Sequence, residues 1–323
     1  MTRLLPLLGL VLFLGGCSGA QQGTTGTAGG KGQGRTMSWT SPLEARKGFQ
    51  TKLLRQEREQ GAVAEPPPGQ LRLIRYDAPA GKLAAYVSVP PQDGMKHPAI
   101  LWVCGGFSNS IGETAWQPGE PDNDQSASAF WKAGVVTMYP SFRGGAGNPG
   151  FKEGFLGEVN DLLAAAEWLA QQEYVDPQRI YLGGHSTGGT LVLLAAAFSN
   201  RFRAVFSFGP IHDISEYGAE NLPFDINDER ELDVRNPILW LHAIRSPTYV
   251  LEGVAPPSNW GSLRELAEAE TKNTALRFHP VANASHFSIL GPATRLLAEK
   301  IRRDAGTEPL TLTEEELGRL FNR

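Results

Sequence analysis

Apolar residues along this chain occur either in short runs or at helical spacing, and the two patterns alternate. Several short runs are continuous, as expected for strands covered on both faces. The expected strands are residues 71–76, 82–89, the run KHPAILWVCGG, and residues 134–140, 179–184, 202–210, 247–253 and 276–281. The expected helices are residues 41–61, 155–173, 187–198, 263–273, 293–304 and the final TLTEEELGRLF. Because strand and helix alternate, crossover connections and a mostly parallel α/β sheet are predicted.

The N-terminal segment has the layout of an export signal. An Arg is followed by a short apolar run and small residues, and residues 1–16 are therefore expected to be a signal peptide. Leu14-Gly15-Gly16-Cys17 resembles a bacterial lipobox, which implies lipidation of Cys17 and membrane anchoring by its acyl chains. Ser18 after the Cys favours the outer membrane, so a lipid-anchored protein of the bacterial cell envelope is predicted, on the periplasmic side or at the cell surface.

The next segment cannot form a core, because residues 17–40 are rich in Gly, Thr, Ser and Gln. We interpret it as a flexible tether, followed by one domain over residues 41–323. The net charge of −4 comes from scattered side chains, which argues against nucleic acid as a partner. If Cys17 carries lipid, Cys104 has no disulfide partner; Cys104 follows AILWV and reads as a buried thiol, with a Cys nucleophile as the alternative.

The central motif GGHSTGGT contains Gly-x-Ser-x-Gly, with the Ser at position 186. This motif is informative only where it joins a strand to a helix. Here RIYLGG precedes it and TGGTLVLLAAAF follows it. A strained turn in that place lifts the Ser hydroxyl above the sheet edge, and Ser186 is therefore the expected nucleophile. A plain Gly-rich turn is the structural alternative.

A Ser hydroxyl needs a general base, and in this motif's usual fold the order along the chain is Ser, acid, His. His286, in PVANASHFSIL, lies just after the last predicted strand and is the expected base. His279 lies inside a strand pattern, where it packs or faces solvent. His242 lies in an apolar run and is interpreted as a core residue, and His212 is a weaker candidate for the base.

The developing oxyanion needs hydrogen-bond donors. The amide after the nucleophile, that of Thr187, is one candidate. The strand AILWV ends in Cys104-Gly105-Gly106-Phe107, where small residues allow backbone amides to face a carbonyl. We therefore expect the second donor at Gly106 or Phe107, with a plain Gly turn as the alternative.

Taken together, CGGF, YPSFRGGAGNPG, GEVNDLLAAAEWL, GGHSTGG, FRAVFSFGPIHD and ASHF resemble, in order and spacing, the motifs of the prolyl oligopeptidase type of α/β-hydrolase over about residues 70–303. The resemblance implies serine hydrolysis of peptide or ester bonds, with neither metal nor cofactor. That family usually carries a β-propeller, for which the segment before residue 70 is too short. We therefore expect no propeller that would restrict access to small peptides. The expected substrate is accordingly either a small peptide or an ester.

The acid of the site departs from the family pattern, which places Asp in G-x-x-D after the seventh strand. Here LEGVAPPSNW has Pro256 at that position, and no Asp occurs between Asp233 and Asp304. Glu252, at the strand end, is one candidate, because a Glu can orient and stabilise the His as Asp does. Asp213, after FGPIH, is the other, and a site without an acid is the third possibility.

Three further expectations concern the surroundings of the site. Residues 215–245 lie between two strands and are expected to form a cap over the Ser. Arg143 is interpreted as a structural anchor bound to Glu158 or Asp161, with a clamp for a substrate carboxylate as the alternative. The function predicted is a serine hydrolase, peptidase or esterase; the alternative is a non-catalytic lipoprotein that keeps the fold and binds a partner. The oligomeric state stays open.

Overall fold

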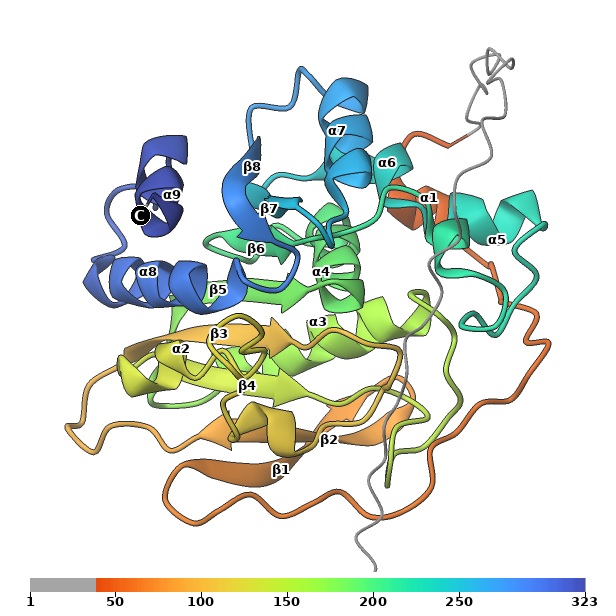
Figure 1. Cartoon of the computed structure of the whole chain (residues 1–323). Coiled ribbons are helices and arrows are strands. Elements are labelled where there is room, and N and C mark those ends of the chain that lie inside the picture. The colour runs from red at the N-terminus through yellow and green to blue at the C-terminus, as the bar shows by residue number, and fades with distance from the viewer. Residues whose placement is uncertain (1–38, 323) are drawn as a thin grey trace, which may run out of the picture. The chain divides into compact units, whose positions relative to one another are not determined.

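The structure is a computed structural model and describes residues 39–322, in which eight strands form one sheet of order β1-β2-β4-β3-β5-β6-β7-β8 (Figure 1). The strands are β1 (Leu71–Ala78), β2 (Gly81–Ser88), β3 (His97–Val103), β4 (Val136–Pro140), β5 (Val175–His185), β6 (Val205–Phe208), β7 (Thr248–Ala255) and β8 (Leu276–Ser285). Strand β2 is antiparallel to both of its neighbours, and the other pairs are parallel. The mostly parallel α/β sheet expected from the sequence is therefore confirmed.

The helices of the described chain cover both faces of the sheet (Figure 1). The α-helices are α1 (Pro42–Arg46), α2 (Ala129–Lys132), α3 (Gly157–Ala170), α4 (Thr187–Phe198), α5 (Glu229–Asp233), α6 (Pro237–Trp240), α7 (Trp260–Ala269), α8 (Leu290–Arg303) and α9 (Glu314–Phe321), with 3-10 turns η1 (Glu113–Ala115), η2 (Ile214–Tyr217) and η3 (Leu241–Ala243). Helices α3 and α4 contact each other, as do α2 and α8. Residues of α2, α8 and α9 share one hydrophobic core with Trp102 and Phe206 of the sheet.

The N-terminal part of the domain differs from the expected helix over residues 41–61. Only Pro42–Arg46 is helical, and Gly48 adopts φ +70, which breaks a right-handed helix. Backbone groups farther along bond to distant segments, Leu54 N to Pro223 O and Glu59 N to Gly144 O. These tertiary hydrogen bonds replace the intrahelical ones. We name residues 47–61 the N-terminal strap; it is the red-orange coil of Figure 1.

The insertion between β6 and β7 contains the short helical elements η2, α5, α6 and η3, joined by irregular segments. Its role as a cap stays a prediction. The signal peptide of residues 1–16, Cys17 and most of the tether lie outside the described residues. Among the helices of residues 39–322, none has the length and apolar character needed to span a membrane.

Candidate active site

Ser186 stands on a sharp turn between β5, which ends at His185, and α4, which begins at Thr187. Its backbone has φ 56 and ψ −118, a conformation that side-chain-bearing residues rarely adopt and that concentrates at functional sites. Two neighbouring glycines are sterically required. A methyl group at Gly184 would lie 2.6 Å from Gly188 O, and one at Gly188 would lie 2.2 Å from Val103 O. The motif therefore forms the strained strand-to-helix turn expected for a nucleophile.

Glu252, inside strand β7, and His286, directly after the adjacent parallel strand β8, form a buried pair. Nδ1 of His286 lies 3.2 Å from both carboxylate oxygens of Glu252. The Glu252 side chain is fully buried, and the His286 backbone is fixed by a 2.8 Å bond from its N–H to Pro257 O. An ionised carboxylate only accepts hydrogen bonds, so Nδ1 carries the proton and Nε2 is left as the basic nitrogen.

Asn259 supports this pair and was not anticipated from the sequence. Its backbone N–H donates to Glu252 Oε1 at 2.8 Å, and its Nδ2 donates to Gly209 O at 2.9 Å. Asn259 lies seven positions after Glu252, in a loop where no motif marks it. It satisfies one carboxylate oxygen and joins it to the loop after β6.

Phe208 and Gly209 connect the His–Glu pair to the nucleophile turn. Ser186 N–H donates to Phe208 O at 2.8 Å. A methyl group at Gly209 would lie 2.5 Å from both His286 Nδ1 and Glu252 Oε2. Within residues 39–322 no hydrogen bond joins Ser186 Oγ to His286; such catalytic hydrogen bonds are often long without substrate and tighten when it binds.

His185 precedes the nucleophile and holds the main chain of the expected base. Its ring centroid lies 4.5 Å from that of His286, and its Nε2 donates to His286 O at 3.0 Å. Burial, together with the charge that His286 can carry, lowers the pKa of His185 to about 3. His185 is therefore neutral at physiological pH. The sequence had suggested no role for it.

The two segments expected to supply oxyanion donors are in direct contact. Thr187 Oγ1 donates to Gly106 O at 2.5 Å, and a methyl group at Gly105 would lie 3.1 Å from Ser186 Cβ. Thr187 is the first residue of α4, where backbone amides have no acceptor within the helix. Phe107 packs edge-on against Tyr217 of the insertion, with ring centroids 5.2 Å apart.

A cavity of about 490 Å³ opens beside this contact. Gly105, Gly106, Phe107 and Thr187 form one part of its wall. Much of the remainder is apolar and aromatic: Trp102, Val103, Ile111, Tyr139, Phe142, Phe155 and Leu191. The cavity is large enough for a small organic group next to the expected oxyanion donors.

The other acid and base candidates are occupied elsewhere. Asp213 accepts hydrogen bonds from the backbone N–H and Oγ of Ser215 and caps η2. His212 Nδ1 lies 3.1 Å from Ser262 Oγ. His279 is buried in β8 and stacks on Tyr249, with ring centroids 5.9 Å apart. Of the two expected alternatives, packing or facing solvent, it therefore adopts packing.

His242 is exposed in η3, so its interpretation as a core residue was wrong. The apolar run around it forms short helical turns that bury Trp240 and Leu241 and turn His242 to solvent. Cys104 is a free thiol in the wall of the 490 Å³ cavity. Burial raises the pKa of its thiol to about 12, so the reactive thiolate is scarce at neutral pH.

Arg143 is an internal anchor. Its Nε and Nη2 bind the two oxygens of Asp161 at 2.9 and 2.8 Å, and its Nη1 binds Glu153 at 2.5 Å. With every terminal nitrogen occupied by carboxylates of the protein, the guanidinium has the structural role expected for it. Of the two expected partners, Glu158 and Asp161, the guanidinium binds Asp161. Its second partner, Glu153, was not expected from the sequence.

Comparison with known proteins finds similarity to the central part of the chain. The model of the prolyl oligopeptidase family matches residues 122–237, a span that includes Ser186 but neither Glu252 nor His286. An uncharacterised protein of Mycobacterium tuberculosis is 29% identical over 164 residues, which are 51% of this chain and 54% of that relative. The chain thus spans about half the length of this curated relative.

Solved structures share the fold at low identity. An acylaminoacyl peptidase of Pyrococcus horikoshii superposes on 77% of this chain and 44% of its own, with a TM-score of 0.58 and 18% identity. An esterase of Pyrobaculum calidifontis covers 74% of this chain and 86% of its own, with a TM-score of 0.55 and 18% identity. Residues 122–237 therefore resemble the prolyl oligopeptidase family, and the described chain has the α/β-hydrolase fold of these solved structures.

Proposed function

We propose that this protein is a serine hydrolase that cleaves a peptide or ester bond through an acyl-enzyme on Ser186. The observation that carries the proposal is the buried His286–Glu252 pair beside the strained Ser186 turn. A carboxylate on Nδ1 leaves Nε2 free to take a proton, as a Ser nucleophile requires.

In this mechanism His286 Nε2 removes the Ser186 proton as Oγ attacks the substrate carbonyl. Glu252 holds the imidazole in the required tautomer and stabilises its protonated form. The amides of Thr187 and of Gly106 or Phe107 bind the oxyanion. His286 then protonates the leaving amine or alcohol. A water molecule, deprotonated by the same nitrogen, hydrolyses the acyl-enzyme and regenerates Ser186.

The cavity beside the expected oxyanion donors supports the proposed substrate class. Its aromatic and aliphatic wall suits an apolar group on the acyl side of the scissile bond. Similarity to a peptidase and to an esterase supports both kinds of bond, and the esterase is matched over 86% of its own length. A small peptide or ester with an apolar acyl group is therefore the proposed substrate.

The location proposed is the bacterial cell envelope, with the lipid on Cys17 as the anchor and the outer membrane favoured. The support is the sequence pattern of residues 1–17. Metabolic labelling with palmitate in a bacterial host tests it. The full chain should incorporate label, and Cys17→Ser should not; labelling of the variant, or none in either protein, rejects the lipid anchor.

The activity is tested with a fluorophosphonate probe on protein that lacks the first 17 residues. Wild type should be labelled, and Ser186→Ala and His286→Ala should not be. Panels of p-nitrophenyl esters and aminoacyl anilides then distinguish esterase from peptidase. Folded wild type that neither reacts with the probe nor hydrolyses any panel member would reject the hydrolase in favour of a non-catalytic binding role.

A further inference from the structure

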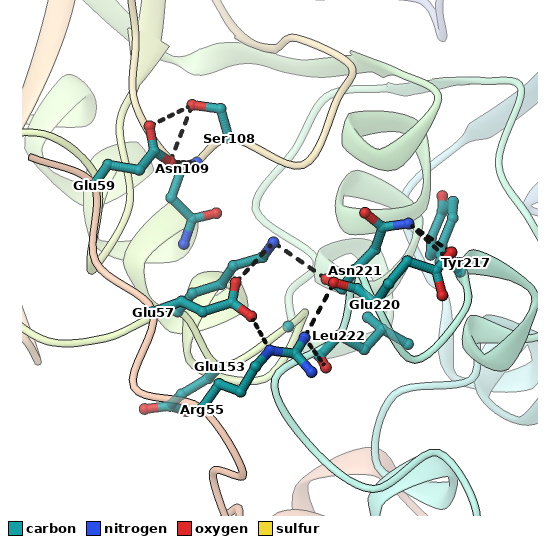
Figure 2. Close-up of polar contacts among 12 residues, drawn as sticks. Arg55, Glu57, Glu59, Ser108, Asn109, Glu153, Tyr217, Glu220, Asn221 and Leu222 are labelled. Atoms are coloured by element: carbon teal, nitrogen blue, oxygen red, sulfur yellow. Dashed lines mark hydrogen bonds and ion pairs between the residues drawn. The ribbon is translucent and has the colours of Figure 1, made fainter. Parts of the chain in front are cut away.

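A single carboxylate of the N-terminal strap binds three consecutive residues of the loop that follows Phe107. Glu59 accepts hydrogen bonds from Ser108 Oγ at 2.9 and 3.1 Å and from Asn109 N–H at 2.7 Å. It also accepts one from Ser110 Oγ at 2.6 Å. Figure 2 shows Glu59 facing Ser108 and Asn109 from the strap.

The strap holds Glu59 in place through its backbone. Glu59 N–H donates to Gly144 O at 2.7 Å, and Lys152 N–H donates to Glu57 O at 3.0 Å. Both partners lie in the loop that follows β4. The backbone is therefore hydrogen-bonded at both Glu57 and Glu59. This fixes the main chain from which the Glu59 carboxylate extends.

The same loop is held from its opposite end by the nucleophile turn. Thr187 Oγ1 binds Gly106 O, so the only residue between this contact and those of Glu59 is Phe107. The amide of Phe107 is one of the expected oxyanion donors. Donors of this kind act only when they are preorganised at the position of the developing charge.

Removing Glu59 is expected to loosen the loop without unfolding it. The Asn109 side chain donates to Arg143 O at 2.8 Å and to Glu158 Oε1 at 3.1 Å. Asn109 O also accepts from Phe142 N–H at 2.9 Å. These inner contacts survive when Glu59 is substituted, so a change in the position of the loop can be separated from a loss of the fold.

The strap also reaches the insertion after β6. Arg55 donates to the carbonyl oxygens of Ala219, Glu220 and Leu222 and binds Glu57 at 2.8 Å (Figure 2). Glu57 in turn lies 3.7 Å from the ammonium of Lys152. The Glu57 side chain therefore bonds to Arg55 and lies near Lys152, whereas Glu59 alone of the two binds residues 108–110 directly.

We propose that Glu59 is a positioning residue for hydrolysis: the N-terminal strap, through Glu59, holds residues 108–110 so that the Phe107 amide faces the oxyanion. The inference rests on the proposed function. It gives one residue of the strap, Glu59, an indirect role in catalysis, although residues 47–61 contribute no strand to the sheet.

The test compares Glu59→Ala and Glu59→Gln with Glu57→Gln, a matched change two residues away on the same strap. Glu59→Ala should lower kcat for a p-nitrophenyl ester roughly 10- to 100-fold with KM changed less than about threefold, because small displacements of reacting groups cost that much. Glu59→Gln should recover part of the loss, since its amide oxygen still accepts. Glu57→Gln should stay within about twofold of wild type, because a partly exposed ion pair such as Glu57–Lys152 contributes little.

A trifluoromethyl ketone measures the oxyanion contacts directly, because its adduct with the nucleophile carries the negative oxygen. Its inhibition constant should rise in Glu59→Ala by about the factor by which kcat/KM falls. A merely structural Glu59 would lower the melting temperature and leave kcat of the folded variant unchanged. That result, or an equal loss in Glu57→Gln, would overturn the proposal.

Hydrogen exchange provides a readout that does not need activity. Peptides over residues 105–110 should exchange faster in Glu59→Ala than in wild type or Glu57→Gln. If wild type hydrolyses nothing, the proposed function fails, while this exchange still decides whether Glu59 holds the loop. Equal exchange in all three proteins would reject the positioning role.

Discussion

Glu252 contacts Nδ1 of His286 through both of its carboxylate oxygens, each at 3.2 Å, from a position inside strand β7. Strand β7 pairs in parallel with β8, and His286 follows directly after β8 ends at Ser285. The carboxyl ends of these two neighbours therefore meet at one edge of the sheet. The Glu252 side chain spans the distance from the strand to the His286 ring.

Replacing Glu252 by Gln should lower kcat by about 10³- to 10⁴-fold, because the amide no longer enforces the tautomer with a basic Nε2. KM should change little. The measurement is steady-state hydrolysis of a p-nitrophenyl ester, with circular dichroism as the check on folding. Asp213→Asn is the matched control and should stay within about twofold of wild type. A large loss in Asp213→Asn with an active Glu252→Gln would assign the acid to Asp213 instead.

Gly209→Ala should disable the site through geometry alone. The new methyl group would lie 2.5 Å from both His286 Nδ1 and Glu252 Oε2, at a backbone with φ +57. The pair must separate, and kcat should fall at least about 100-fold. Gly261→Ala, where a methyl group meets no atom within 4 Å on α7, should leave kcat unchanged. Wild-type kcat in folded Gly209→Ala would contradict the proposed role of the pair.

The alternation of strands and helices and the Ser186 turn could be predicted because both depend on local patterns. Continuous apolar runs indicate buried parallel strands, and a Gly-x-Ser-x-Gly between strand and helix permits only a few backbone geometries. The order Ser, acid, His along the chain then favours His286 among the histidines as the expected base. For the acid, spacing left Glu252 and Asp213 open, because which one faces the ring depends on the pairing of β7 with β8.

The N-terminal strap could not be predicted, because its conformation is set by partners far along the chain. Its charged sequence suits an exposed helix. Arg55, however, donates to the carbonyl oxygens of Ala219, Glu220 and Leu222, and Glu59 binds residues 108–110. Asn259 was missed for the same reason, since its bond to Glu252 forms only once the loop after β7 is folded. Tertiary hydrogen bonds override local propensity in both segments.

Cys104 should resist alkylation in the native protein. Burial raises the pKa of its thiol to about 12, and only the thiolate reacts with iodoacetamide. Labelling at pH 8, followed by mass spectrometry, should therefore be at least about tenfold slower in the folded protein than in urea. The rate should rise as pH increases, because more thiolate forms. Rapid labelling of the folded protein at pH 8 would show that the thiol is activated and would revive Cys104 as a candidate nucleophile.

His185 should make the protein sensitive to mild acid. Burial lowers its pKa from the ordinary 6.5 to about 3, so below pH 6.5 the unfolded chain binds a proton that the folded chain does not. The contribution of neutral His185 to the free energy of unfolding is complete above pH 6.5 and is lost as pH falls toward 3. At pH 5 the loss is about 2 kcal/mol. His185→Gln removes this titration and keeps a donor for His286 O. Between pH 7.5 and 5.0, the free energy of unfolding measured in urea should therefore fall by about 2 kcal/mol less in the variant than in wild type. Equal decreases in the two proteins would mean that His185 can be protonated in the folded protein.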